Sequence, residues 1–159
     1  MTLGQFERRV LRIGFAGYHG PFYSPRAFHT LVWPRLCKIA HIIHENRGKV
    51  LFASDGDLWP VADDLFGSSG VDGFYEIDRL AKMDLGALRK TFPQLTLVGN
   101  ISSHTLHVGS RADVVEETLS CLEDARTYQG IIVGISNQPV PGTPLENIEA
   151  MLRTIADFG

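Results

Sequence analysis

The sequence predicts an α/β fold with a parallel sheet, on three observations. Short apolar runs rich in β-branched residues alternate with stretches of helical periodicity along the 159 residues. Two of these runs, LTLVG at 95–99 and GIIVGI at 130–135, are apolar on both faces, as buried parallel strands are. The strict alternation of strand and helix implies parallel strands joined by right-handed crossovers.

Composition and charge narrow the class of protein. Lys and Arg number 15 against 18 Asp and Glu, a formal net charge of -3 with no basic stripe for nucleic acid. No apolar run approaches the roughly 18 residues of a membrane span. The two cysteines, Cys37 and Cys121, are too few for a disulfide framework. We therefore expect a single cytoplasmic domain over residues 1–159, with no nucleic-acid or membrane partner.

The expected elements follow one another in order along the chain. Ser24 and Pro25 should begin a helix that runs to Asn46 with a kink near Pro34. Strands are expected at 11–16, 49–53, 72–76, 95–99 and 130–135. Further helices are expected from Pro60 to about Gly67, over 84–91, after a capping box of Ser110 with Asp113, and after Thr143-Pro144-Leu145-Glu146, where Thr143 is the expected N-cap.

Five strand–helix units fit two architectures. An open doubly wound sheet would be complete with five strands, whereas a (β/α)8 barrel needs eight. Composition and periodicity do not choose between the two.

The residues just beyond the carboxyl ends of the strands are the candidates for chemistry, because ligand sites form there in parallel α/β folds. Carboxylates, amides and hydroxyls at such a rim suit polar binding, proton transfer or a hard cation. The candidates are Tyr18 and His19 after the first strand, Asp55 and Asp57 after the second, Glu76 at the third, Asn100 at the fourth, His104 just past it, and Ser136 and Asn137 after the fifth.

A purely structural role is an alternative for several of these candidates. Asp55 belongs to an Asp-Gly pair that is common in turns, and Asp57 could cap the helix after Pro60. Glu76 could form a surface ion pair with Arg79. Asn100 and Asn137 could be turn residues, so both interpretations stay open at each position.

Histidine pairs and glycine motifs give weaker signals. His41 and His44 lie three apart in an expected helix, on a solvated face, and do not form the HExxH zinc motif. His104 and His107 are three apart in an expected loop, where His104 is the candidate for ligand contact. Neither GxxxxGK[ST] nor GxGxxG occurs, which argues against the usual nucleotide enzymes.

A series of short motifs resembles the uroporphyrinogen decarboxylase superfamily. The motifs are GPFYSPRAF, the pair Trp33-Pro34, LFASDGDL, VDGFYEID, LVGNIS, HVGSRADVVEE and GTPLENIEAM. In this order they resemble the carboxyl-terminal part of that family's (β/α)8 barrel, from about Gly20 to Phe158. The resemblance implies a partial TIM barrel made of the last five βα units, with the first three units missing from this chain.

The resemblance also implies an activity. The superfamily contains uroporphyrinogen decarboxylases and corrinoid-dependent methyltransferases, and this chain is closer to the second branch. Asp55, Asp57 and Glu76 would be the catalytic carboxylates, and a corrinoid carried by a partner protein would dock over the rim. Contacts to a small-molecule substrate would come from Tyr18, His19, Asn100, His104, Ser136 and Asn137.

Zinc is the metal that some members of this branch use. Those members carry a His-x-Cys pair after one strand and another Cys before the last helix, where this chain has Ala53, Asp55 and Asn137. Zinc favours thiolate and imidazole ligands, and alanine offers no donor. We therefore expect no zinc site and no tightly bound cofactor, and we assign no metal ligand.

Two other functions stay open. One is decarboxylation of uroporphyrinogen in porphyrin biosynthesis, and the other is a non-catalytic partial-barrel subunit or a truncated gene product. An isolated barrel segment exposes strand edges and inner-face residues. We therefore expect this chain alone to be inactive and to pair with the missing part of the barrel or with a second copy.

Overall fold

The computed structural model describes residues 9–12, 16–17 and 20–158. Five parallel strands form one sheet in which each strand pairs with the next of the five along the chain, which confirms the predicted α/β fold. An antiparallel pair of short strands, Ala16–Gly17 (β2) and Gly20–Pro21 (β3), follows the first strand. The order across the sheet is Arg9–Arg12 (β1), Val50–Ala53 (β4), Gly73–Ile77 (β5), Thr96–Gly99 (β6) and Ile131–Ile132 (β7).

The first helical segment contains the irregularity predicted near Pro34. It consists of Pro25–Ala27 (α1), a π-helical turn at Phe28–Val32 (η1) and Trp33–Glu45 (α2), and the Ser24 hydroxyl caps its start. Pro34 has no N–H to donate and its ring crowds the preceding turn, so the helix widens just before it.

The remaining helices are mostly those expected. Ser110 and Asp113 form the predicted capping box, in which each side chain accepts a hydrogen bond from the other residue's N–H. The helices are Trp59–Val61 (η2), Asp63–Ser68 (η3), Arg79–Ala81 (η4), Leu85–Thr91 (α3), Ser103–Val108 (α4), Arg111–Thr127 (α5) and Leu145–Asp157 (α6).

Two local predictions are wrong. His104 and His107 lie in a helix, α4, and not in a loop, because the Ser102 hydroxyl accepts from the N–H groups of His104 and Thr105 and so caps it. Thr143 is not the N-cap of α6, since Pro144 takes that position. The Thr143 hydroxyl donates instead to the carbonyl oxygen of Val140, at 2.8 Å.

One face of the sheet is covered and the other is not. Phe52, Phe74 and Leu97 stand in register on neighbouring strands, and each is 0% exposed. On the opposite face Leu51, Tyr75, Thr96 and Val98 are partly exposed, and Ile132 of β7 is 52% exposed. The expectation that both faces of β7 are buried is therefore wrong.

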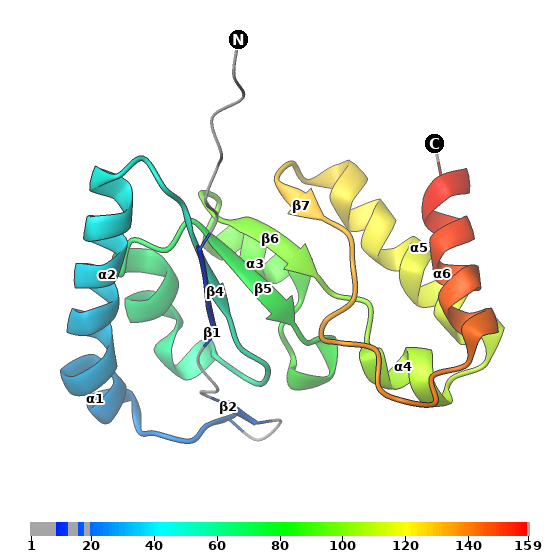
Figure 1. The fold of residues 1–159 in the computed structure, drawn as a ribbon, viewed down its shortest axis with the longest axis horizontal. Coiled ribbons are helices and arrows are strands. Elements are labelled where there is room, and N and C mark those ends of the chain that lie inside the picture. The colour runs from blue at the N-terminus through cyan, green and yellow to red at the C-terminus, as the bar shows by residue number, and fades with distance from the viewer. Residues whose placement is uncertain (1–8, 13–15, 18–19, 159) are drawn as a thin grey trace, which may run out of the picture.

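The placement of the helices explains this difference. Helices α2, α3, α5 and α6 flank or back the sheet, whereas α4 and β2 lie near the end to which β5 and β6 point (Figure 1). A sheet with helices on one face only is the wall of a barrel, whereas an open doubly wound sheet carries them on both. Within the described segments, no helix has the length and apolar character needed to cross a bilayer.

Candidate functional site

Two candidates that are far apart in the sequence are in direct contact. Nδ2 of Asn137 donates hydrogen bonds to Oδ1 and Oδ2 of Asp55, at 2.9 and 2.8 Å, across 82 residues. Asp55 follows β4 and Asn137 follows β7, while β5 and β6 lie between these strands. Three strand spacings of about 4.8 Å separate β4 from β7 by about 14 Å. The two segments must therefore curve over the ends of β5 and β6.

A third hydrogen bond orients the Asn137 amide. The N–H of Gln138 donates to Oδ1 of Asn137, at 2.7 Å. A flipped amide would turn its oxygen toward the Asp55 carboxylate and its NH₂ toward the N–H of Gln138, so both contacts would become repulsive. The three hydrogen bonds together allow a single orientation of the Asn137 amide.

Glu76 occupies an unusual backbone position at the end of β5. Tyr75 pairs with Val98 and Ile77 with Gly99, so Glu76 is the extra residue of a bulge. Its φ of 68° lies in the left-handed region, which is rare for a residue with a side chain. The residue is 3% exposed. Glu76 is therefore not the surface partner of Arg79 that was considered from the sequence.

Asp78 is a buried acid at the same end of β5, and the sequence reasoning missed it. Oδ1 of Asp78 accepts from the N–H of Leu80 at 2.9 Å and caps η4. Burial raises the pKa of the Asp78 carboxyl above its ordinary value, and the negative charges of Asp55 and Glu117 raise it further. The last acid of the motif VDGFYEID, which ends at Asp78, was the signal that could have found it.

Asn100, after β6, is held at both ends of its amide by the protein itself. Nδ2 donates to the carbonyl oxygen of Met83 at 3.1 Å, and Oδ1 accepts from the thiol of Cys121 at 3.3 Å. Asn100 is 1% exposed, and burial raises the pKa of the Cys121 thiol, which keeps it protonated and able to donate. Asn100 therefore joins the rim to helix α5.

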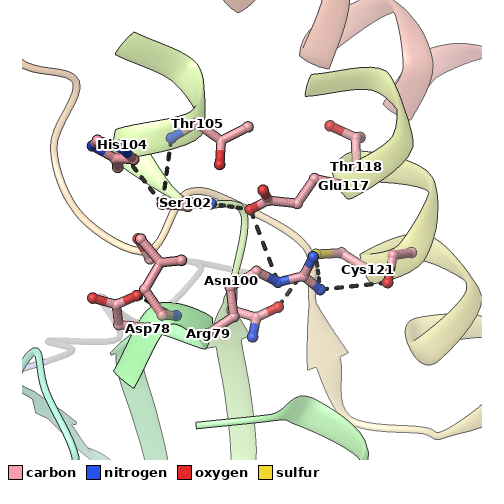
Figure 2. Close-up of polar contacts among 12 residues, drawn as sticks. Asp78, Arg79, Asn100, Ser102, His104, Thr105, Glu117, Thr118 and Cys121 are labelled. Carbon is pink, nitrogen blue, oxygen red and sulfur yellow. Dashed lines mark hydrogen bonds and ion pairs between the residues drawn. The ribbon is translucent and has the colours of Figure 1, made fainter. Parts of the chain in front are cut away.

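Arg79 extends this connection, and Figure 2 shows its guanidinium between Glu117 and Cys121 of α5. It forms an ion pair with Glu117 at 3.9 Å and donates to the Ser120 hydroxyl at 3.4 Å. Glu117 also accepts a hydrogen bond from the N–H of Ser102. These contacts tie the ends of β5 and β6 to one helix and give the Arg79 charge a partner there.

The other candidates are placed as follows. Oδ1 of Asp57 accepts from the N–H of Trp59 at 3.0 Å, a turn contact just before η2, whose N-cap is Leu58 and not Asp57. Ser136 is 2% exposed and accepts from the N–H of Ser103 at 3.4 Å. His104 is exposed on α4. Tyr18 and His19 lie outside the described residues.

The carboxyl ends of β4 to β7, with Asp55, Glu76, Asp78, Asn100 and Asn137, are called the mouth below. The side chains near the mouth offer oxygen and amide groups. Among the residues that the structure describes, no three of His, Cys, Asp and Glu gather closely enough to hold a metal ion. The arrangement can bind polar groups through Asp55 and Asn137 and can hold a proton at Asp78.

The family comparison agrees with this architecture. The family described as "Uroporphyrinogen decarboxylase (URO-D)" matches residues 9–158. The chain belongs to the uroporphyrinogen decarboxylase family. The resemblance seen in the motifs is thereby confirmed, and with it the partial TIM barrel. A search of curated proteins found no match.

One solved structure can be compared with this chain in fold and in length. The fold is similar to that of a "methyltransferase from Methanosarcina mazei", with a TM-score of 0.74 and 24% sequence identity. The match covers 94% of this chain and 41% of the methyltransferase chain. This member of the family therefore spans less than half the length of that protein, and the likeness concerns the fold.

Proposed function

We propose that this chain forms the carboxyl-terminal wall of a corrinoid-dependent methyltransferase that acts on a small molecule. The observation that supports it most is the contact between Asp55 and Asn137, which closes over the strand ends where Glu76 and Asp78 are buried. A mouth of this kind places carboxyl groups around a polar substituent. Membership of the family and a methyltransferase with the same fold favour this chemistry.

The residues of this chain bind the substrate and manage a proton. A corrinoid on a partner protein, docked over the rim, would supply the cobalt that takes the methyl group. The bond between the methyl carbon and the substrate heteroatom breaks, and the heteroatom keeps the electron pair and needs a proton. Asp78, whose pKa is raised by burial, can hold that proton, while Asp55 orients the substituent.

The other rim candidates take supporting roles in this proposal. Glu76 is a further acid at the mouth, and Ser136, Asn137 and His104 lie on the segments that border it. Asp57 and Asn100 hold the rim in shape through contacts to their own protein. Tyr18 and His19 stay predicted substrate contacts.

Decarboxylation of uroporphyrinogen is the weaker alternative. That tetrapyrrole carries many carboxylates, whereas Asp55, Glu76 and Asp78 give the described part of the mouth a negative character. Like charges at short range disfavour binding. The Arg79 guanidinium is directed to Glu117 and α5.

The uncovered face of the sheet supports a further part of the proposal. Val98 and Ile132 are in register on this face, and in a complete barrel such residues fill the interior. We propose that the remaining barrel units, or a second copy of the chain, cover it. The free thiols of Cys37 and Cys121 suit a reducing, cytoplasmic location.

A transfer assay tests the function. The chain, joined to the rest of its barrel, is mixed with reduced cobalamin and a panel of methoxy- and methylamino-substituted compounds, and loss of each methylated compound is followed by chromatography. Demethylation that depends on both protein and cobalamin is expected. Conversion of uroporphyrinogen to coproporphyrinogen would instead establish the alternative, and inactivity in both assays would favour a non-catalytic subunit.

A further inference from the structure

The contact between Asp55 and Asn137 bears on the metal content of the same site. The resemblance to zinc-dependent methyltransferases places their ligands at Ala53, Asp55 and Asn137. Sequence separation alone does not say whether these positions meet in this chain. The structure brings Asp55 and Asn137 within 2.8–2.9 Å of each other, so two of the three positions could share one ion.

Ala53 lies where a third ligand could reach the same point. It is the last residue of β4, two residues before Asp55, and it stands in register with Tyr75, on the face of the sheet opposite to Phe52. A longer side chain at this position would extend from that face at the carboxyl end of the strand, which is where the Asp55 segment begins. A ligand-bearing side chain at position 53 would therefore start beside the Asp55 segment.

The donor set of this chain does not fit zinc. Alanine has no donor atom, and a carboxamide is not among the usual zinc ligands, which are thiolate, imidazole and carboxylate. Only Asp55 offers a usual ligand at the three positions. A single carboxylate does not make the three or four protein ligands of a zinc centre.

The hydrogen bond instead satisfies both side chains without a metal. Asn137 presents its N–H groups to the two carboxylate oxygens, and the N–H of Gln138 fixes the amide in that orientation. A donor opposite a carboxylate stabilises its negative charge, which is part of what a bound cation would do. The two strand ends are thereby joined by a neutral amide.

We infer that the Asp55–Asn137 hydrogen bond takes the place of a zinc centre in this chain, and that the surrounding backbone still has the geometry of that centre. The site is thus a metal-free variant that thiolate and imidazole side chains would convert into a zinc site. This inference goes beyond the proposed methyl transfer, because it concerns what the three positions bind.

The test measures metal binding and not activity. The full chain is freed of metal with a chelator, equilibrated with zinc, and its bound zinc is determined by mass spectrometry. The wild-type chain should retain no stoichiometric zinc. The triple variant A53H/D55C/N137C should bind one zinc per chain, and cobalt(II) in its place should give thiolate-to-cobalt charge-transfer absorption.

Matched controls make each outcome decisive. The variant A53H/D55S/N137S has the same added ring without thiolates and should show no such absorption. Because a histidine at the buried Ala53 could impair folding, A53D/D55C/N137C, which has a smaller third ligand, is measured in parallel and should also give the cobalt–thiolate band. Stoichiometric zinc in the wild-type chain would overturn the inference, as would a folded cysteine variant that binds no cobalt. Either result would leave the transfer assay unaffected.

Discussion

The side-chain amide of Asn137 bridges the two carboxylate oxygens of Asp55, and by doing so it joins the ends of two strands that are not neighbours in the sheet. Backbone pairing alone holds only adjacent strands together. The hydrogen bond therefore indicates that the sheet curves, as the wall of a barrel does.

A double-mutant cycle measures the strength of this bond. Asp55→Ala, Asn137→Ala and the double variant are compared by urea unfolding. Because a partly buried hydrogen bond to a charged group contributes about 1.5–3 kcal/mol, we expect a coupling energy of this size. Strictly additive effects of the two substitutions would mean that the side chains do not interact in solution.

Replacing the Asp55 carboxylate tests whether Asp55 acts in catalysis or only forms a turn. In the active barrel, Asp55→Asn should lower turnover at least about tenfold, because a carboxylate that orients the substrate acts in the transition state. The melting temperature should fall by only a few degrees, since the variant weakens the hydrogen bond to Asn137 but leaves the core unchanged. Wild-type turnover in this variant would assign Asp55 to turn formation.

Asp78→Asn should stabilise the chain at neutral pH. Burial raises the pKa of Asp78 in the folded state above the ordinary value of 3.8. The contribution of this carboxyl therefore favours folding below pH 3.8 and is lost as the pH rises through the folded-state pKa. Asparagine can still accept from the N–H of Leu80 and carries no charge.

Thermal melting across pH checks this expectation. The midpoint of Asp78→Asn should exceed that of the wild type near neutrality, and the difference should shrink in acid. Asp78→Ala, which also removes the cap of η4, is the comparison that separates charge from capping. A lower midpoint for Asp78→Asn at neutral pH would show that the charged carboxylate stabilises the fold.

Asp72 should make the fold sensitive to acid, in the opposite direction. Burial acts to raise its pKa, but hydrogen bonds from Lys49, His44 and the N–H of Val50 outweigh this and hold the pKa below 3.8. Its stabilising effect is thus present above pH 3.8 and lost as the pH falls through the folded-state pKa. Asp72→Asn should flatten the loss of stability in acid, measured by urea unfolding, while Asp63→Asn on the exposed surface should not.

Two aliphatic truncations distinguish the faces of the sheet. Leu97→Ala, at a residue that is 0% exposed, should destabilise by about 2–5 kcal/mol. Ile132→Ala should destabilise by about 1 kcal/mol, because this side chain is 52% exposed. Equal losses in urea unfolding would mean that the face carrying Ile132 is covered in solution.

Sedimentation tests whether a second copy of the chain covers the face that carries Ile132. An apolar sheet face with a free strand edge favours association, so we expect the isolated chain to be larger than a monomer. Ile132→Lys should shift it toward the monomer, and Lys substitution at the exposed Leu152 of α6 is the control. A wild-type chain that sediments as a single monomer would contradict this expectation.

The order of strands and helices was predictable because local interactions set it. The capping box at Ser110, the start of the first helix at Ser24 and the disturbance near Pro34 all depend on residues within one or two turns. The expected N-cap at Thr143 failed because Pro144 takes that position, and the Thr143 hydroxyl instead donates to the carbonyl oxygen of Val140. Motif order along the chain also indicated the family.

The candidates were expected at the carboxyl ends of the strands, since parallel strands end at one edge, and Asp55 and Asn137 meet there. The contact between Asp55 and Asn137, the bulge that buries Glu76 and the raised pKa of Asp78 were decided only by the tertiary structure. Each of these depends on how far the sheet curves and which helices pack on it. Such packing arises from contacts over tens of residues, and no local pattern of side chains encodes it.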